Sequence, residues 1–436
     1  MSEIESTVED AGGVARKVRV SVPAERCKAE FDKAYDKLRP RVQLQGFRKG
    51  KVPRAMLESH YGDDVRKEVI ETLIETGLSG AVEEHHLHIA ATPRLVDQQY
   101  DADSGLVFEV SVELRPEFEL SDYSGRSLVR RIVRVGDAQV DRSLEGLRER
   151  MAVLENEVDR DAVEQGDIVV FDMFGFDEDE NPVPGTEAAG VQIEVGEGKF
   201  GEDFESQLVG VVREHKAPVS VSYPDEHANE DLRGRTVRFD VTVREIKRKV
   251  LPDVDDDFAR DLGIDDCDSL DDLRGKIRED LAERAVAEAD RRVRGELLES
   301  LVDGHEFDVP QSLVDETVAS MAQELGAQPQ DEEQWGKIRE ALEPRATKQV
   351  KAGFLLDAVV RAEEIEVDKA EVEERVRMEL AAAGPRAEEV RKHYSSRAAI
   401  ADLANSLARE KAVRKLVDLS TVTDQEIDES EVADQG

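Results

Sequence analysis

The stretch Leu44-Gln45-Gly46-Phe47-Arg48-Lys49-Gly50-Lys51-Val52-Pro53-Arg54 organises the N-terminal part of the chain. The chain has 60 Lys and Arg residues against 100 Asp and Glu residues, a net charge of −40, yet no acidic residue lies between Lys37 and Leu57. Glycine and proline break both the helix and the strand period, so the stretch predicts a presented loop with an exposed Phe47. Such a patch on an anionic protein concentrates attraction for polyanions on one face. The alternative is an ordinary solvated basic loop.

The eight residues Gly46-Phe47-Arg48-Lys49-Gly50-Lys51-Val52-Pro53 resemble the ribosome-docking signature of trigger factor, a family of bacterial ribosome-associated chaperones. Two further segments, Leu114–Leu120 and Leu251–Asp253 with Phe258, resemble that family's domain junctions. The resemblance covers nearly the whole chain. It implies contacts with ribosomal protein and RNA near the tunnel exit, carried by this set: Gly46, Phe47, Arg48, Lys49, Gly50 and Pro53.

The bulk composition predicts several domains in 436 residues. Charged residues make up 37% and aromatic residues only 5%, which favours long solvated helices over one thick core. The negative charge argues against binding to DNA or anionic membranes. The sequence shows neither a secretory signal at Met1 nor an apolar run long enough to span a bilayer. The only cysteines, Cys27 and Cys267, lie far apart, which fits a reducing cytoplasm.

The N-terminal residues predict an α+β module that presents the basic loop between two helices. Strands are expected at 14–22, 88–96 and 106–114, and helices after Pro23 and from Arg54, the second interrupted at Gly62. The histidines His85, His86 and His88 have no second group of ligands at metal spacing, so a helix end with exposed imidazoles explains them better than a metal site.

A connector helix and a β-rich domain are expected next. Apolar residues at Val140, Leu144, Leu147, Met151 and Leu154 give one helical face. Short strands follow at 167–171, 191–195, 217–221 and 237–243, separated by turn residues. Their pattern resembles the FKBP-type peptidyl-prolyl isomerases.

That resemblance implies an isomerase pocket, although several aromatic positions of the family are replaced here. The apolar residues that remain are Met173, Val191, Phe200, Phe204 and Phe239, and they fit a domain core as well as a pocket. The expected activity is therefore weak or absent. Residues Gly196–Gly201 also match G-x-G-x-x-G, but the β-rich surroundings and the acidic Glu202-Asp203 argue against a dinucleotide site.

The chain beyond Lys249 is expected to be helical. Apolar residues recur every fourth position from Leu273 to Leu301, so this stripe winds around the helix and meets different partners along its length. Further amphipathic stretches are expected at 313–325, 350–365, 372–380 and 400–417, and most of their apolar residues should be core. Left-over apolar side chains would hold unfolded chains; the candidates are Leu298, Val318, Met321 and Phe354.

These observations predict a multidomain α+β protein with an all-α C-terminal part. The expected parts are a ribosome-binding domain (1–116), a connector and helix (117–160), an FKBP-like domain (161–248), a helical chaperone domain (249–420) and an acidic disordered tail (421–436). The resemblance implies an ATP-independent chaperone for nascent chains, cytoplasmic, without cofactor or metal, and monomeric on the ribosome; dimerisation of the free protein stays open. Two alternatives remain: a working prolyl isomerase, and an RNA-binding adaptor that uses only the loop.

Overall fold

The computed structural model describes residues 4–44, 47–48, 50–177, 179–224, 232–327 and 332–432. The chain divides into two compact units, each built from two segments. The first unit comprises Met1–Arg131 with Asp290–Gln425, and the second comprises Ile132–Ala289 with Glu426–Gly436. Among the described residues, no helix combines the length and the apolar character that a membrane crossing requires.

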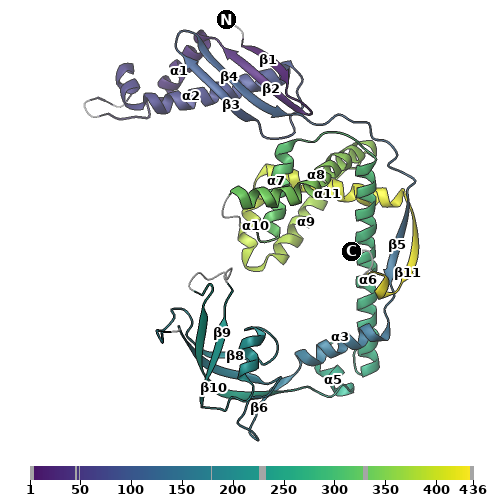
Figure 1. Cartoon of the computed structure of the whole chain (residues 1–436). Helices are drawn as coiled ribbons and strands as arrows, with labels where there is room; N and C mark the ends of the chain where they lie inside the picture. The colour runs from purple at the N-terminus through teal and green to yellow at the C-terminus, as the bar shows by residue number, and fades with distance from the viewer. Residues whose placement is uncertain are drawn as a thin grey trace. The chain divides into compact units, whose positions relative to one another are not determined.

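The N-terminal part of the first unit is an antiparallel sheet covered on one face by two helices (Figure 1). Its strands lie in the order β1-β2-β4-β3, and the inward residues of β2 and β4 face each other, with Val18 opposite Val110 and Val20 opposite Phe108. The expected α+β module is thereby confirmed. Its elements are β1 (Glu5–Asp10), β2 (Ala15–Val22), α1 (Ala24–Leu38), α2 (Arg54–Glu84), β3 (Arg94–Asp101) and β4 (Gly105–Glu113).

The helix α2 lies very close to this sheet at Gly77. A Cβ atom there would come within 3.0 Å of the Phe108 ring and 3.2 Å of Val20, so only glycine permits this approach without a shift. The expected interruption at Gly62 is wrong, because α2 runs unbroken from Arg54 to Glu84. The expected strand at 88–96 begins later, since proline at position 93 cannot donate to a ladder and β3 starts after it.

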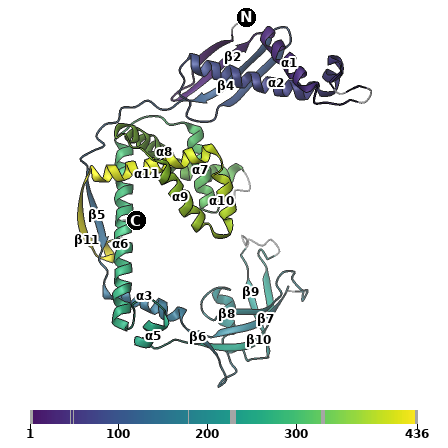
Figure 2. The ribbon, with the colours of Figure 1, turned by 180° about the vertical axis from the view of Figure 1, so that it is seen from behind.

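The C-terminal part of the first unit is helical (Figure 2). Each of the expected amphipathic stretches lies mostly in a helix, which confirms the all-α prediction, although the stretch at 350–365 passes the end of α8 at Ala362. Its α8 starts well before the expected stretch and continues through Pro344. The helices are α6 (Leu270–Asp303, from Asp290 on), α7 (Gln311–Glu324), α8 (Glu332–Ala362), α9 (Lys369–Ala382), η1 (Gly384–Arg386), α10 (Ala387–His393) and α11 (Arg397–Asp418).

The winding stripe of α6 meets two different cores, as expected. Within the second unit, Leu273 and Ile277 pack with Val140, Leu144 and Phe258 from α3 (Asp137–Arg150) and α5 (Asp256–Asp261). Within the first unit, the later residues of the stripe pack on another set: Val293, Leu297 and Leu301 contact a cluster that includes Leu128, Leu355 and Leu416. The two ends of the stripe therefore pack on different neighbours, while Leu281 and Ala285 between them stay only partly buried.

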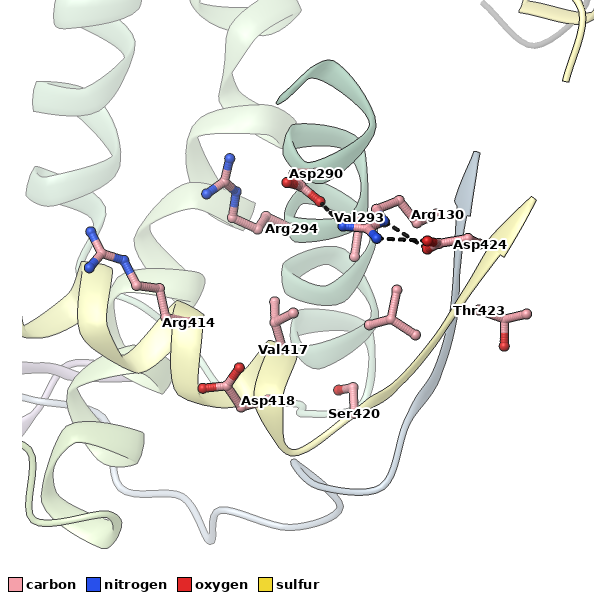
Figure 3. Close-up of a pocket in the computed structure, with 11 residues that line it drawn as sticks. Arg130, Asp290, Val293, Arg294, Arg414, Val417, Asp418, Ser420, Thr423 and Asp424 are labelled. Carbon is pink, nitrogen blue, oxygen red and sulfur yellow. Dashed lines mark hydrogen bonds and ion pairs between the residues drawn. The ribbon is translucent and has the colours of Figure 1, made fainter. Parts of the chain in front are cut away.

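The expected disordered tail is wrong for residues 421–432. Strand β11 (Thr421–Ile427) pairs with β5 (Ser127–Val133), and α12 (Glu429–Val432) follows. Arg130 holds this pairing, because its guanidinium donates two hydrogen bonds of 2.8 Å to Asp424 and one of 3.0 Å to Asp290 on α6 (Figure 3). The hydrogen bonds from Arg130 lower the pKa of Asp424. The acidic side chains that suggested disorder are thus partly neutralised by a distant arginine.

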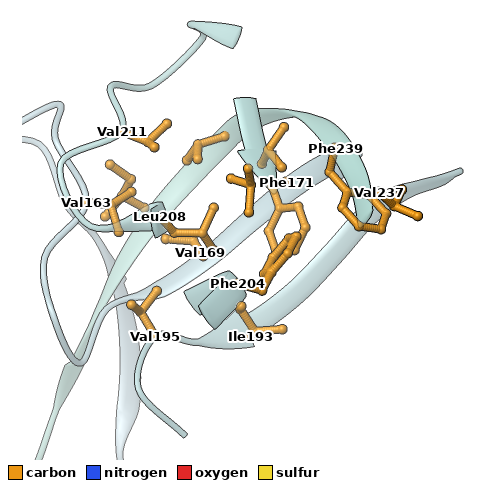
Figure 4. Packing of buried hydrophobic residues seen from close by; sticks show 14 of the residues in the cluster. Val163, Val169, Phe171, Ile193, Val195, Phe204, Leu208, Val211, Val237 and Phe239 are labelled. Atoms are coloured by element: carbon orange, nitrogen blue, oxygen red, sulfur yellow. The ribbon is translucent and has the colours of Figure 1, made fainter. Parts of the chain in front are cut away.

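The β-rich part of the second unit is an antiparallel sheet in the order β6-β10-β7-β8, with β9 also on β10. Its apolar core lies between the sheet and a short helix, α4 (Figure 4). The expected helix through Met151 and Leu154 is too long, because α3 ends at Arg150 and a strand begins at Val153. The elements are β6 (Val153–Asn156), β7 (Ile168–Phe176), β8 (Ala188–Glu194), α4 (Glu202–Leu208), β9 (Lys216–Ser222) and β10 (Thr236–Val250).

Candidate functional site

The basic loop leaves α1 after Leu38 and enters α2 at Arg54, where the proline before the helix adopts an extended conformation with φ −62° and ψ 148°. Gln45, Gly46 and Lys49 lie outside the described residues. Phe47 differs from expectation, because its side chain is only partly exposed and packs against the N-terminal core, which also contains the buried Val52. Gly50 has a φ of +80°, a turn conformation that favours glycine.

The loop presents cationic side chains to solvent. Arg41, Arg48 and Lys51 are exposed, and none of the ion pairs in the described part of the chain includes them. Because an unpaired guanidinium or ammonium group keeps its full attraction for phosphate, these residues suit a polyanionic partner. A half-buried Phe47 beneath them fixes the backbone and leaves part of its ring available for contact.

Arg54, by contrast, belongs to the fold. It donates a hydrogen bond of 2.7 Å to Glu58 and another to Asp32, and its guanidinium lies 4.5 Å from the centroid of the Tyr35 ring. The hydrogen bond to Glu58, followed by that to Asp32, outweighs burial and raises the pKa of Arg54. The charge of Arg54 is therefore balanced within the domain and is not free for a partner.

The expected isomerase residues come together in the second unit. Phe204 and Phe239 are buried, with ring centroids 5.8 Å apart, whereas Met173, Val191 and Phe200 pack against the same cluster with part of their side chains exposed. The first two residues are core. The other three pack against that core and keep part of their side chains exposed, and none of the five residues is an acid or a base.

The G-x-G-x-x-G loop after β8 is occupied by the protein's own carboxylate. Glu205, only 1% exposed, accepts hydrogen bonds from the backbone N–H groups of Gly196, Gly198 and Phe200 at 2.8, 2.8 and 2.9 Å. Burial alone raises the pKa of Glu205, but these N–H donors outweigh it and the net pKa is lowered. Because β8 is antiparallel to β7 and the amides are already satisfied, the loop has no place for a pyrophosphate.

The expected client-binding residues separate into two groups. Val318 is fully buried and Met321 is 9% exposed; both pack with Val314 and Ala346, so their prediction as free surface is wrong. Leu298 and Phe354 keep part of their side chains exposed. Helical periodicity alone marks apolar faces, and it does not tell which of them another helix covers.

An apolar groove that the sequence did not reveal lies at the start of α9. Val367, Val372, Val376 and Ile400 line a cavity of about 530 Å³, and Met378 further along α9 is 56% exposed. A groove with aliphatic walls accepts apolar side chains of varied shape.

Comparison with known proteins agrees with this architecture. Residues 4–147 match the family model described as bacterial trigger factor protein, residues 269–418 match its C-terminal model, and residues 160–244 match FKBP-type peptidyl-prolyl cis-trans isomerase. A trigger factor from a Geobacter species is 32% identical over 427 residues, covering 96% of this chain and 98% of that protein. The trigger factor of Geobacter sulfurreducens is 31% identical, covering 96% and 99%.

A solved structure of a trigger factor chaperone aligns with 95% of this chain and 99% of its own, at 21% sequence identity and a TM-score of 0.45. The assignment rests on the sequence relatives and the family models. The chain belongs to the trigger factor family and carries that family's FKBP-type domain between its N-terminal and C-terminal regions.

Proposed function

We propose that this chain is an ATP-independent, ribosome-associated chaperone that holds nascent chains in the cytoplasm and keeps them open for folding or export. The observation that supports this proposal most strongly is the presented loop. Arg41, Arg48 and Lys51 are exposed there and form no ion pair among the described residues, on a chain of net charge −40. Attraction to the ribosomal large subunit is then confined to one face, while the remaining acidic surface is repelled by RNA.

The loop acts through charge and through one aromatic anchor. Exposed cations contribute rapid, salt-sensitive association, whereas partly buried aromatic residues give complexes their lifetime. Phe47, Arg48 and Lys49 are the proposed contacts, and Gly46, Gly50 and Pro53 complete the proposed docking set. On the ribosome the chaperone works as a monomer, since a single loop makes the contact.

The holding surface is proposed to be the partly exposed walls of the groove, Val367, Val376 and Ile400, together with the partly exposed Leu298 and Phe354. Weak apolar contacts at several points shield an unfolded segment and release it when folding buries the same side chains. This mechanism requires no nucleotide.

Suppression of aggregation tests the holding surface. The full chain is added to a chemically unfolded client, and light scattering is compared with that of a Val367→Ser, Val376→Ser, Ile400→Ser variant. We expect clear suppression by the natural chain and a weaker effect of the variant. A control with Leu325→Ser, an apolar residue 71% exposed directly after α7, should behave like the natural chain. Equal suppression by both variants would contradict the role of the groove, and no suppression by the natural chain would contradict the chaperone itself.

A slow prolyl isomerase activity is proposed for the FKBP-type domain. The barrier of ~18–20 kcal/mol comes from amide resonance, so an apolar surface that favours the twisted, less polar amide lowers it without a nucleophile. Met173, Val191 and Phe200 supply that surface above Phe204 and Phe239. A proline-peptide assay on the full chain should give a low rate that falls further in Phe200→Ala. A rate at background for the natural chain would leave the domain without catalytic function.

A further inference from the structure

A groove between α1 and α2 begins at the base of the docking loop. Residues of both helices recur at steps of three and four along it, so one face of each helix lines a cavity of about 420 Å³. Gly62 leaves space at its floor, because a Cβ atom there would still lie 3.9 Å from the hydroxyl of Tyr35. Since α2 starts directly after the loop, any partner of the loop passes close to this groove.

One wall of the groove is aromatic. Phe31 and Tyr100 are both partly exposed, and their ring centroids lie 5.4 Å apart with the ring planes tilted by 42°. The guanidinium of Arg66 lies 5.7 Å from the centroid of the Tyr100 ring. Partly exposed aromatic rings beside a planar guanidinium offer flat surfaces on which another ring can stack. A purely aliphatic partner would not need such surfaces.

The lining of the groove carries one more cation than carboxylate. Arg54 is neutralised by Asp32 and Glu58, whereas Lys28 and Arg66 are exposed and have no carboxylate partner among the residues that the structure describes. The acidic residue that remains at the rim is Asp63, which is exposed as well. Three cations and two carboxylates thus line the groove itself, while Asp32, the other partner of Arg54, lies outside its lining.

We propose that this groove binds an unstacked nucleotide of single-stranded RNA, with the base against Phe31 and Tyr100 and the phosphate on Lys28 and Arg66. Aromatic rings interleaved with cations are the arrangement by which proteins hold single strands, since every base has a π-face and every link has a phosphate. An acidic peptide would bind the cations but would have no group to stack on the aromatic rings. The inference rests on the proposed ribosome docking, because exposed ribosomal RNA beside the loop would supply the nucleotide.

Fluorescence anisotropy with a short labelled single-stranded RNA tests the groove in the full chain. Tyr100→Leu should weaken binding by about 5- to 150-fold, the loss of one stacked base. The double variant Lys28→Gln, Arg66→Gln should reduce the slope of log K against log salt by about 1.4, because each phosphate contact on a single strand contributes roughly 0.7. The matched control, Arg26→Gln with Lys67→Gln, removes the same two charge types from neighbouring positions outside the groove and should change neither quantity in this way.

Two further measurements keep the test decisive if Tyr100→Leu destabilises the domain. Gly62→Leu fills the groove without altering its aromatic rings or its charges, so this variant should also weaken RNA binding. An abasic oligonucleotide, which has the phosphates but lacks the bases, should bind the natural chain less tightly than the intact RNA. Equal binding of abasic and intact RNA, or displacement of the RNA by polyglutamate at equal charge concentration, would overturn the proposal. So would groove variants that match the control.

The outcome is separable from that of the docking loop. If the loop variant Phe47→Ala, Arg48→Ala, Lys49→Ala loses ribosomes while the groove variants bind RNA and ribosomes like the control, the groove inference fails and the docking proposal stands. If the loop variant still binds ribosomes, the docking proposal fails, whatever the groove does.

Discussion

Replacement of Glu205 by glutamine should destabilise the FKBP-type domain by about 3 kcal/mol at neutral pH. The carboxylate accepts hydrogen bonds from three backbone N–H groups and is 1% exposed. A glutamine in its place keeps one acceptor oxygen and turns an NH₂ group toward at least one N–H donor. The change therefore loses a charge-assisted bond and buries opposed donors, each costing about 1–3 kcal/mol.

Hydrogen exchange with mass spectrometry is the suitable assay, because the only tryptophan, Trp335, lies in another part of the chain and does not report on this domain. Where exchange follows the opening free energy, peptides from β7 and β8 should exchange roughly 150-fold faster in Glu205→Gln. Glu202→Gln, an exposed change of the same charge on the same helix, is the control and should exchange like the natural chain. An effect of Glu205→Gln no larger than that of the control would refute the reasoning.

The pH dependence of this effect has a definite sign. The folded-state pKa of Glu205 is lowered, so its contribution to stability is complete above the unfolded-state pKa of about 4.3 and is lost as the pH falls through the folded-state value. The difference in exchange between the natural chain and Glu205→Gln should consequently shrink in acid and stay constant from neutral to mildly alkaline pH. A difference that grows in acid would contradict the assignment.

Three further substitutions test the packing of the first unit. Gly77→Val should destabilise the N-terminal domain by about 1–3 kcal/mol, because the new side chain meets Phe108. Gly80→Ala on the same helix has open space and should stabilise the domain by up to about 1 kcal/mol. Thermal melting checks both variants, and equal melting temperatures of the two would contradict the close approach at Gly77. Asp424→Asn should release β11 from Arg130, seen as faster proteolysis and amide exchange of 421–432. Unchanged exchange there would show that backbone pairing alone holds the strand.

Much of the architecture could be predicted because it depends on local signals. Pro53 marks the start of α2, and the four-residue stripe of α6 predicts a helix that changes partners. The mistakes involve distant contacts. Arg130 and Asp424 are 294 residues apart in sequence, so the acidic segment carried no sign of its partner.

The functional site divides in the same way between features that local sequence predicts and features that depend on distant contacts. Charge and turn residues predicted a presented cationic loop, but only the fold shows that Phe47 packs back on the core. Periodicity marked Val318 as apolar, and packing with α8 residue Ala346 determines that it is buried. The groove between α1 and α2 was invisible in sequence for a comparable reason, because its rings come from a helix and from a strand far along the chain.

Co-sedimentation with bacterial ribosomes tests the central claim most directly. The natural chain is compared at low and raised salt with Phe47→Ala, Arg48→Ala, Lys49→Ala and with the control Arg26→Ala, Lys67→Ala. We predict that the natural chain and the control pellet with ribosomes, that salt weakens both, and that the loop variant binds at least about 30-fold less tightly, as expected for loss of a hot spot. Failure of the natural chain to pellet, or equal pelleting of the loop variant, would contradict ribosome docking through this loop.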